Sequence, residues 1–186
     1  MQGSDDRINH LSANQDIHDD PHMISLLIAK LAAKDGLERE RARRSLVAIG
    51  SPAVADLIEL LEAPNKQVRW EAAKALADIA DPVAAEALVK ALEDEVFDVR
   101  WLAGEGLINL KRDGLVPLLQ ALIERSDSPW LRDAAHHVLH DLAVGELEEL
   151  LEPIMDSLED AEAAIETPLI AKAILDRLVS GQPENR

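Results

Sequence analysis

One segment of the sequence recurs at a nearly constant distance, and this recurrence limits the chain to a repeat fold. VRWEAAKAL starts at Val68, VRWLAGEGL at Val99 and LRDAAHHVL at Leu131. From the arginine of each segment, and also from Arg39, the third following residue is alanine and the seventh is leucine (Ala42, Leu46; Ala72, Leu76; Ala103, Leu107; Ala135, Leu139). A fixed period of this length is typical of stacked supersecondary units.

A second amphipathic helix precedes each recurring segment. Its apolar residues are spaced i, i+3, i+4, as on one face of a helix: Leu57, Leu60, Leu61; Leu88, Ala91, Leu92; Leu119, Leu122, Ile123. Five capping residues stand before a proline and mark helix starts: Asp20, Ser51, Asp81, Ser128 and Thr167. Four glycines mark helix ends: Gly36, Gly50, Gly114 and Gly145. We therefore predict five helix pairs: 21–34 with 37–49, 52–62 with 66–80, 82–93 with 97–111, 115–125 with 129–144, and 146–158 with 168–179.

Composition supports helices and narrows the function. Aromatic residues make up only 2% of the chain, which has no Tyr and no Cys, so a sheet core, disulfides and thiolate chemistry are disfavoured. A formal net charge of −17 argues against binding nucleic acid. No signal peptide or membrane span is expected, and we expect a cytoplasmic protein. We expect residues 1–20 to be a disordered tail, residues 21–180 to be the repeat domain and residues 181–186 to be a C-terminal tail. The His22-Met23 pair leaves open that residues 1–22 are partly vector-derived.

The segment V-R-x-x-A-x-x-A-L in a hairpin of about 31 residues resembles the HEAT repeat, in the short variety found in phycobilin lyase subunits. The resemblance covers residues 21–180, the last pair only weakly. It implies an all-α, right-handed α-solenoid of about five hairpins whose second helices line a concave face. It also implies that arginines at the repeat signature pair with aspartates in the turns between helices, as a structural ladder: Arg69, Arg100 and Arg132, with Asp94 and Asp98. The alternative for these arginines is contact with an acidic partner.

Tryptophans recur on the second helices. Trp70 and Trp101 follow the signature arginine directly and face away from the core-directed alanines and leucines. We expect them, side by side, to mark a partner-binding face, with Trp130 opening the next second helix. Neighbouring positions of the same ridges complete the predicted set: Lys74, Glu105 and His137. The alternative is that the rings pack between repeats as spacers.

Catalytic and metal sites are not expected. Asp133, His137 and His140 have a spacing that can place ligands on one helix face, but His136 occupies a core-facing register. The His-Glu pairs by which deoxyhypusine hydroxylase, a HEAT-like enzyme, binds iron are missing, because the corresponding positions hold Trp70-Glu71, Trp101-Leu102 and Asp133-Ala134. We therefore predict a non-catalytic scaffold without cofactor that binds a protein or peptide, and neither nucleic acid nor membrane. The alternative is an accessory subunit of a chromophore- or cofactor-handling enzyme, similar to a phycobilin lyase.

Overall fold

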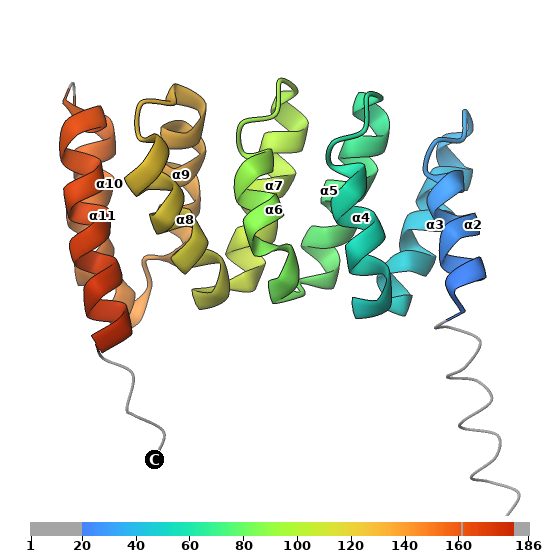
Figure 1. The fold of residues 1–186 in the computed structure, drawn as a ribbon, viewed down its shortest axis with the longest axis horizontal. Coiled ribbons are helices and arrows are strands. Elements are labelled where there is room, and N and C mark those ends of the chain that lie inside the picture. Colours follow the sequence, from blue (N-terminus) through green and yellow to red (C-terminus); the bar gives the residue numbers. More distant parts are fainter. Residues whose placement is uncertain (1–19, 161, 181–186) are drawn as a thin grey trace, which may run out of the picture. The chain divides into compact units, whose positions relative to one another are not determined.

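The computed structural model describes residues 20–160 and 162–180, in which all regular structure is helical. Ten α-helices follow one another, three of them preceded by a 3₁₀ turn (Figure 1). Their bounds are α2 Pro21–Lys30, α3 Gly36–Ile49, α4 Val54–Leu60, α5 Lys66–Ile79, α6 Ala85–Ala91, α7 Phe97–Leu110, α8 Arg112–Arg125, α9 Pro129–Leu142, α10 Glu148–Glu159 and α11 Ala163–Ser180. The all-α class and the hairpin organisation are confirmed. The right-handed superhelix stays a prediction.

The chain divides into two compact units, 1–79 and 80–186. In the first unit, α2 pairs with α3 and α4 pairs with α5, and the second helices α3 and α5 pack against each other. Figure 1 shows these two hairpins in blue and teal. The described part of this unit therefore consists of two helical hairpins joined through their second helices.

The second unit contains three hairpins, and the last one exchanges its layers. The first helices α6 and α8 pack together, and so do the second helices α7 and α9. In the final hairpin, however, α10 packs on α9 and α11 packs on α8. Our prediction made 146–158 a first helix and 168–179 a second helix. This ordering is wrong, because the short connection after α9 places α10 beside α9, and the longer α11 then covers α8.

The repeat signature supplies the core. The four alanines and four leucines that follow the signature arginines are all buried, and Leu76 is fully inaccessible, as predicted. The leucines of the preceding helices, such as Leu57, Leu88 and Leu119, are also fully buried. Small and aliphatic side chains on facing helices therefore fill the hairpins with scarcely any aromatic contribution.

The predicted start of the last helix is wrong for an identifiable reason. Pro168 was expected to begin a helix but lies inside α11, which starts at Ala163. Proline has no N–H to donate to the carbonyl of Ala164, four residues earlier. The hydroxyl of Ser126 donates to that carbonyl instead, at 2.9 Å, so the helix continues through the proline.

Gly114 was expected to end a helix but lies in the first turn of α8. A side chain there would begin only 2.5 Å from the carbonyl oxygen of Leu107, so this position requires glycine for close packing of α8 on α7. Gly36 likewise begins α3 rather than ending a helix, whereas Gly50 ends α3 at a positive φ, as predicted.

The predicted tails, 1–20 and 181–186, lie outside the described residues except for Asp20. The Asp20 side chain accepts a hydrogen bond from the N–H of His22 and caps α2, as its place before Pro21 predicted. Within residues 20–160 and 162–180, no helix has the length and apolar character needed to cross a bilayer.

Candidate binding site on α7 and α9

The signature arginines fix the turn that precedes each second helix. Each donates from Nη1 to the backbone carbonyl six residues earlier: Arg39 to Ala33 at 2.9 Å, Arg69 to Ala63 at 3.0 Å, Arg100 to Asp94 at 2.6 Å, and Arg132 to Ser126 at 2.5 Å. Carbonyls at a helix C-terminus lack intrahelical donors, so a guanidinium at this place stabilises the hairpin turn. The same bond therefore recurs in four successive repeats of the chain.

The aspartates of the predicted ladder lie at the same turn. The Asp94 carboxylate accepts from the N–H of Val96 at 2.7 Å, while its carbonyl receives Arg100. Asp98 is exposed in the first turn of α7, where a negative charge is favourable at the helix N-terminus. The signature arginines thus stabilise the turn of their own repeat, and the ladder of arginines paired with aspartates stays a prediction.

Aromatic side chains gather on α7 and α9. Trp101 stacks on His137, with 4.4 Å between ring centroids and 21° between planes, and the ring centroid of Phe97 lies 6.3 Å from that of Trp101. The Arg100 guanidinium lies 4.9 Å from the ring centre of Trp130 and 5.6 Å from that of Phe97. Sequence therefore placed Trp101, Trp130 and His137 correctly on one helix pair, and the structure adds Phe97 and Arg100 to them.

All of these side chains except Trp130 border a pocket of about 310 Å³ on the two helices, which is lined by Phe97, Arg100, Trp101, Gly104, Asp133, Ala134, His136, His137 and His140. This volume is at the lower end of the range for ligand sites, roughly 300 to 1,000 Å³. Gly104 forms part of the floor, and a side chain there would contact Val138 and His137. The small residue thus keeps the pocket open beside the stacked Trp101.

The three histidines of α9 contact three different acids. His137 Nε2 lies 3.3 Å from Glu105 of α7, His136 Nε2 lies 3.1 Å from Glu159 of α10, and His140 Nδ1 lies 3.2 Å from Asp141. His136 and His137 are thus directed to opposite neighbours of α9. In the described ranges, no group of three or more His, Asp or Glu residues is placed to hold a metal ion. The imidazoles serve here as pairing and stacking groups.

The remaining predicted binding residues, Trp70 and Lys74, lie on α5 in the first unit. Trp70 is half-buried beneath the Arg43 guanidinium, which lies 5.3 Å from its ring centre. Lys74 forms an ion pair with Asp78 at 2.6 Å. Trp70 and Trp101 belong to different units, so their side-by-side arrangement stays a prediction.

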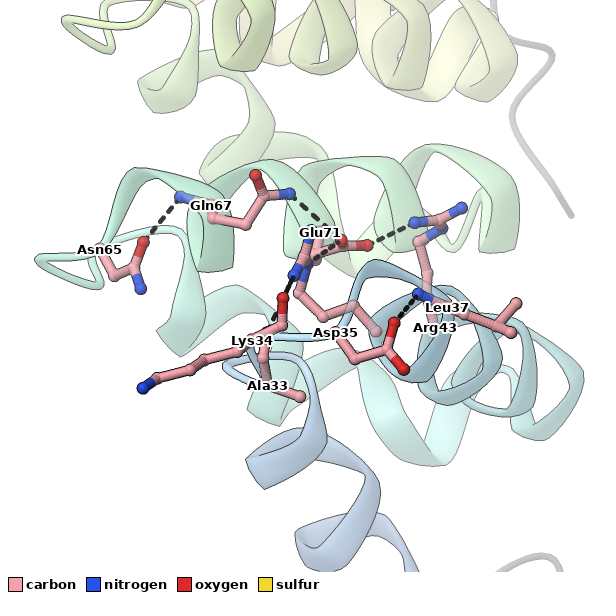
Figure 2. A network of polar contacts seen from close by, with 9 residues as sticks. Ala33, Lys34, Asp35, Leu37, Arg43, Asn65, Gln67 and Glu71 are labelled. Carbon is pink, nitrogen blue, oxygen red and sulfur yellow. Dashed lines mark hydrogen bonds and ion pairs between the residues drawn. The ribbon is translucent and has the colours of Figure 1, made fainter.

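Next to Trp70, Glu71 forms a buried polar network that sequence reasoning did not find. Its carboxylate is 3% exposed and receives Arg39 Nε at 3.1 Å, Gln67 Nε2 at 3.2 Å, and Arg43 Nη1. Figure 2 shows Glu71 between Gln67 and Arg43. The sequence carried a signal for this network. The segment RERARR is rich in arginine, and Glu71 is the only glutamate that directly follows a tryptophan.

Phe97 and the Arg100 stacking were also missed, although the sequence carried a signal for Phe97. It is the only phenylalanine of the chain, and it precedes Trp101 by four residues, which places both on one face of a helix. Phe97 lies in the first turn of α7, before the repeat signature begins at Val99.

Comparison with known proteins agrees with this architecture. Residues 24–108 match the family model of HEAT repeats. This stretch of the chain consists of HEAT repeats. A search of the curated proteins gave no match.

Two solved structures are similar. A chain from the complex of CpcE and CpcF of phycocyanin lyase from Nostoc sp. PCC7120 is 28% identical, with a TM-score of 0.57 over 82% of this chain and 99% of that chain. An engineered protein is 21% identical, with a TM-score of 0.44 over 90% of this chain and 87% of that chain. The resemblance to phycobilin lyase subunits expected from the repeat signature is thereby confirmed at the level of fold.

Proposed function

We propose that this chain is a non-catalytic, protein-binding subunit of a two-protein assembly, which serves a chromophore- or cofactor-handling enzyme of the phycocyanin lyase kind. The observation that carries the proposal is the match to the CpcE–CpcF complex, which covers 99% of the matched chain. The similarity thus extends over nearly the whole of a protein whose structure was solved together with a second protein. A protein partner is accordingly the first expectation for this chain.

The site on α7 and α9 supports a protein partner. Phe97, Trp101 and Trp130 are exposed by 58%, 47% and 49%. Tryptophan and arginine are enriched among residues that dominate binding energy, because large flat groups contribute much contact area at small entropic cost. Rings left this open in a chain so poor in aromatics are better explained by contact with a partner than by packing within the hairpins.

A free-standing scaffold that binds a peptide without any chromophore is the second candidate. It is favoured by the pocket on α7 and α9, whose volume of about 310 Å³ suits one or two side chains of a peptide. The two candidates differ in one readily measured property. Protein purified from its native source with its partner should absorb visible light if the assembly handles a chromophore, and should be colourless if it is a scaffold.

The binding proposal is tested by isolating the chain with its native partner and measuring the complex by size-exclusion chromatography. We expect a complex of defined stoichiometry that is lost in the Trp101→Ala, Trp130→Ala double variant. The matched control is Ile165→Ala on α11, which truncates an apolar side chain that is 69% exposed on another surface. A complex that survives the double variant, or that Ile165→Ala disrupts equally, would refute the assignment of binding to α7 and α9.

A further inference from the structure

We propose that the site on α7 and α9 binds a basic segment of the partner protein, whose arginine or lysine side chains contact the exposed rings of Phe97, Trp101 and Trp130 and pair with Asp133. This inference rests on the proposed function, because it names the chemistry of the partner that the same site receives. Three observations carry it: the distribution of aromatic rings, their present contact with a guanidinium, and the balance of formal charges.

The distribution of aromatic side chains is uneven. The chain contains one Phe, three Trp and no Tyr, and all of these except Trp70 lie at this site. The aliphatic core is closed without them, since the largest fully buried side chains of the described residues are all leucines. The rings are therefore not needed to fill the hairpins, and roughly half of each ring-bearing side chain is open to a ligand.

The rings already bind a cation of the protein itself. Arg100 lies between Phe97 and Trp130, at 5.6 and 4.9 Å from the ring centres. Such distances are within the range of about 6 Å in which the electron-rich face of an aromatic ring attracts a guanidinium. Arg100 is held there by its bond to the Asp94 carbonyl. Arg100 thus shows that these rings accept a guanidinium group. The exposed parts of the rings can accept a cationic group of a partner in the same way.

The formal charges on α7 and α9 sum to a negative value. On α7 and α9, four carboxylates stand against two arginines (Asp98, Glu105, Asp133 and Asp141; Arg100 and Arg132). The two arginines keep their positive charge and are held in place by backbone carbonyls, and Glu105 and Asp141 contact histidines. Asp133 lines the pocket and is exposed, and its carboxylate makes no hydrogen bond or ion pair among the residues that the structure describes. It is thus the group placed to pair with an incoming cation.

The charge of the whole chain acts in the same direction. A formal net charge of −17 attracts basic partners and repels acidic ones over distances of about 8 Å at physiological salt. An acidic peptide would meet Asp133 at the pocket as well as this general repulsion. A second copy of the chain would bring a further −17 to the contact, so self-association is disfavoured.

The inference is tested with three fluorescein-labelled octapeptides in which alanine alternates with arginine, citrulline or glutamate. Citrulline keeps the shape of arginine and removes its charge. Fluorescence anisotropy in 150 mM salt should show the arginine peptide binding at least tenfold more tightly than the citrulline peptide, with no binding of the glutamate peptide. Equal binding of the arginine and citrulline peptides, preference for glutamate, or no binding up to millimolar concentration would each overturn the inference.

General attraction to an acidic protein is separated from binding at the site by matched variants. Asp133→Asn should weaken arginine-peptide binding at least fivefold, whereas Asp156→Asn, which removes the same charge from the exposed surface of α10, should weaken it less than twofold. Trp101→Leu keeps apolar volume and removes the aromatic face, and should weaken binding at least fivefold while the circular dichroism stays unchanged. Equal effects of Asp133→Asn and Asp156→Asn would show that the affinity for the peptide depends only on net charge, and would overturn the inference.

The outcome distinguishes this inference from the proposed function. If the native complex forms and an excess of arginine peptide does not compete with it, the partner is bound through other chemistry and the inference fails alone. If the arginine peptide binds at the site but no native complex can be isolated, the proposed function fails and the site chemistry stands. If the arginine peptide both binds and displaces the native partner, both are supported.

Discussion

Two pairs of neighbouring second helices, α3 with α5 and α7 with α9, share one backbone arrangement and differ in what lies between them. Between α3 and α5, Glu71 is buried and bonded to Arg39, Arg43 and Gln67. Between α7 and α9, the partners are Trp101, His137 and Glu105, around a pocket open to solvent. In the first pair the charged groups bind one another, and in the second the aromatic groups are left accessible.

The difference shows how a repeat fold separates stability from function. The signature positions, alanine and leucine in the core and arginine at the turn, are the same in both pairs. The position after the signature arginine holds Trp70 and Trp101, yet Arg43 lies over the first ring, whereas the second ring stacks on His137 and its residue is 47% exposed. The side chains that a neighbouring helix places against a tryptophan therefore determine how much of its ring is left accessible.

The strongest test of this comparison is removal of the buried carboxylate. Glu71→Ala leaves the guanidinium groups of Arg39 and Arg43 side by side with no anion between them, at 19% and 15% exposure. Loss of one partner of a buried ion pair costs roughly 3 kcal/mol or more. We expect the free energy of unfolding, measured by urea denaturation, to fall by about 3 kcal/mol.

The matched control is Glu105→Ala, which removes a carboxylate paired with His137 on the α7–α9 pair. Its side chain is 41% exposed, so water replaces the lost contact, and the loss should stay under about 1 kcal/mol. Equal losses from the two variants would mean that burial does not distinguish the two helix pairs and would remove the basis of the comparison.

The tryptophans give the next largest effect, and it should divide between binding and stability. Truncating Trp101 and Trp130 together should lower the free energy of unfolding by under about 1 kcal/mol each, as at most exposed positions, yet reduce partner binding by about 2 kcal/mol or more. Trp70→Ala should do the reverse, because its half-buried ring supports Arg43 above Glu71. Titration calorimetry with the isolated partner, together with urea denaturation, checks both halves; a large drop in stability for the Trp101 and Trp130 variant would make those rings packing spacers.

The fold was predictable because each repeat carries the same pattern of core residues. An alanine three residues and a leucine seven residues after the arginine define one face of a helix, and every one of these side chains is buried. The exchange of layers in the last hairpin was not predictable, since periodicity tells which face of α10 is apolar but not whether α8 or α9 covers it. The helix start predicted at Pro168 is wrong because Ser126, which donates to the Ala164 carbonyl in place of the proline, is remote in sequence.

The site was predictable in part. Trp101, Trp130, Glu105 and His137 follow from the outward-facing register of the second helices, and the structure brings all four to α7 and α9. Contacts that depend on rotamers were not: the stacking of Trp101 on His137 and the position of Arg100 between two rings have no signature in residue spacing. The buried network at Glu71 required knowing that its helix faces the arginines of α3.

The smallest expected effect is that of Lys74→Ala, and it tests how far the binding surface extends. Lys74 and His137 occupy the same register of their helices, five residues after Arg69 and Arg132. Lys74 makes an exposed pair with Asp78 within α5, so Lys74→Ala should change stability by under about 0.5 kcal/mol. If binding is confined to α7 and α9, Lys74→Ala leaves partner affinity within twofold of the original. His137→Ala removes the group that holds the Trp101 ring by stacking and should weaken partner binding severalfold at nearly unchanged stability. A weakening by Lys74→Ala as large as that by His137→Ala, measured by the same calorimetry, would extend the binding surface into the first unit and show that α3–α5 and α7–α9 act together.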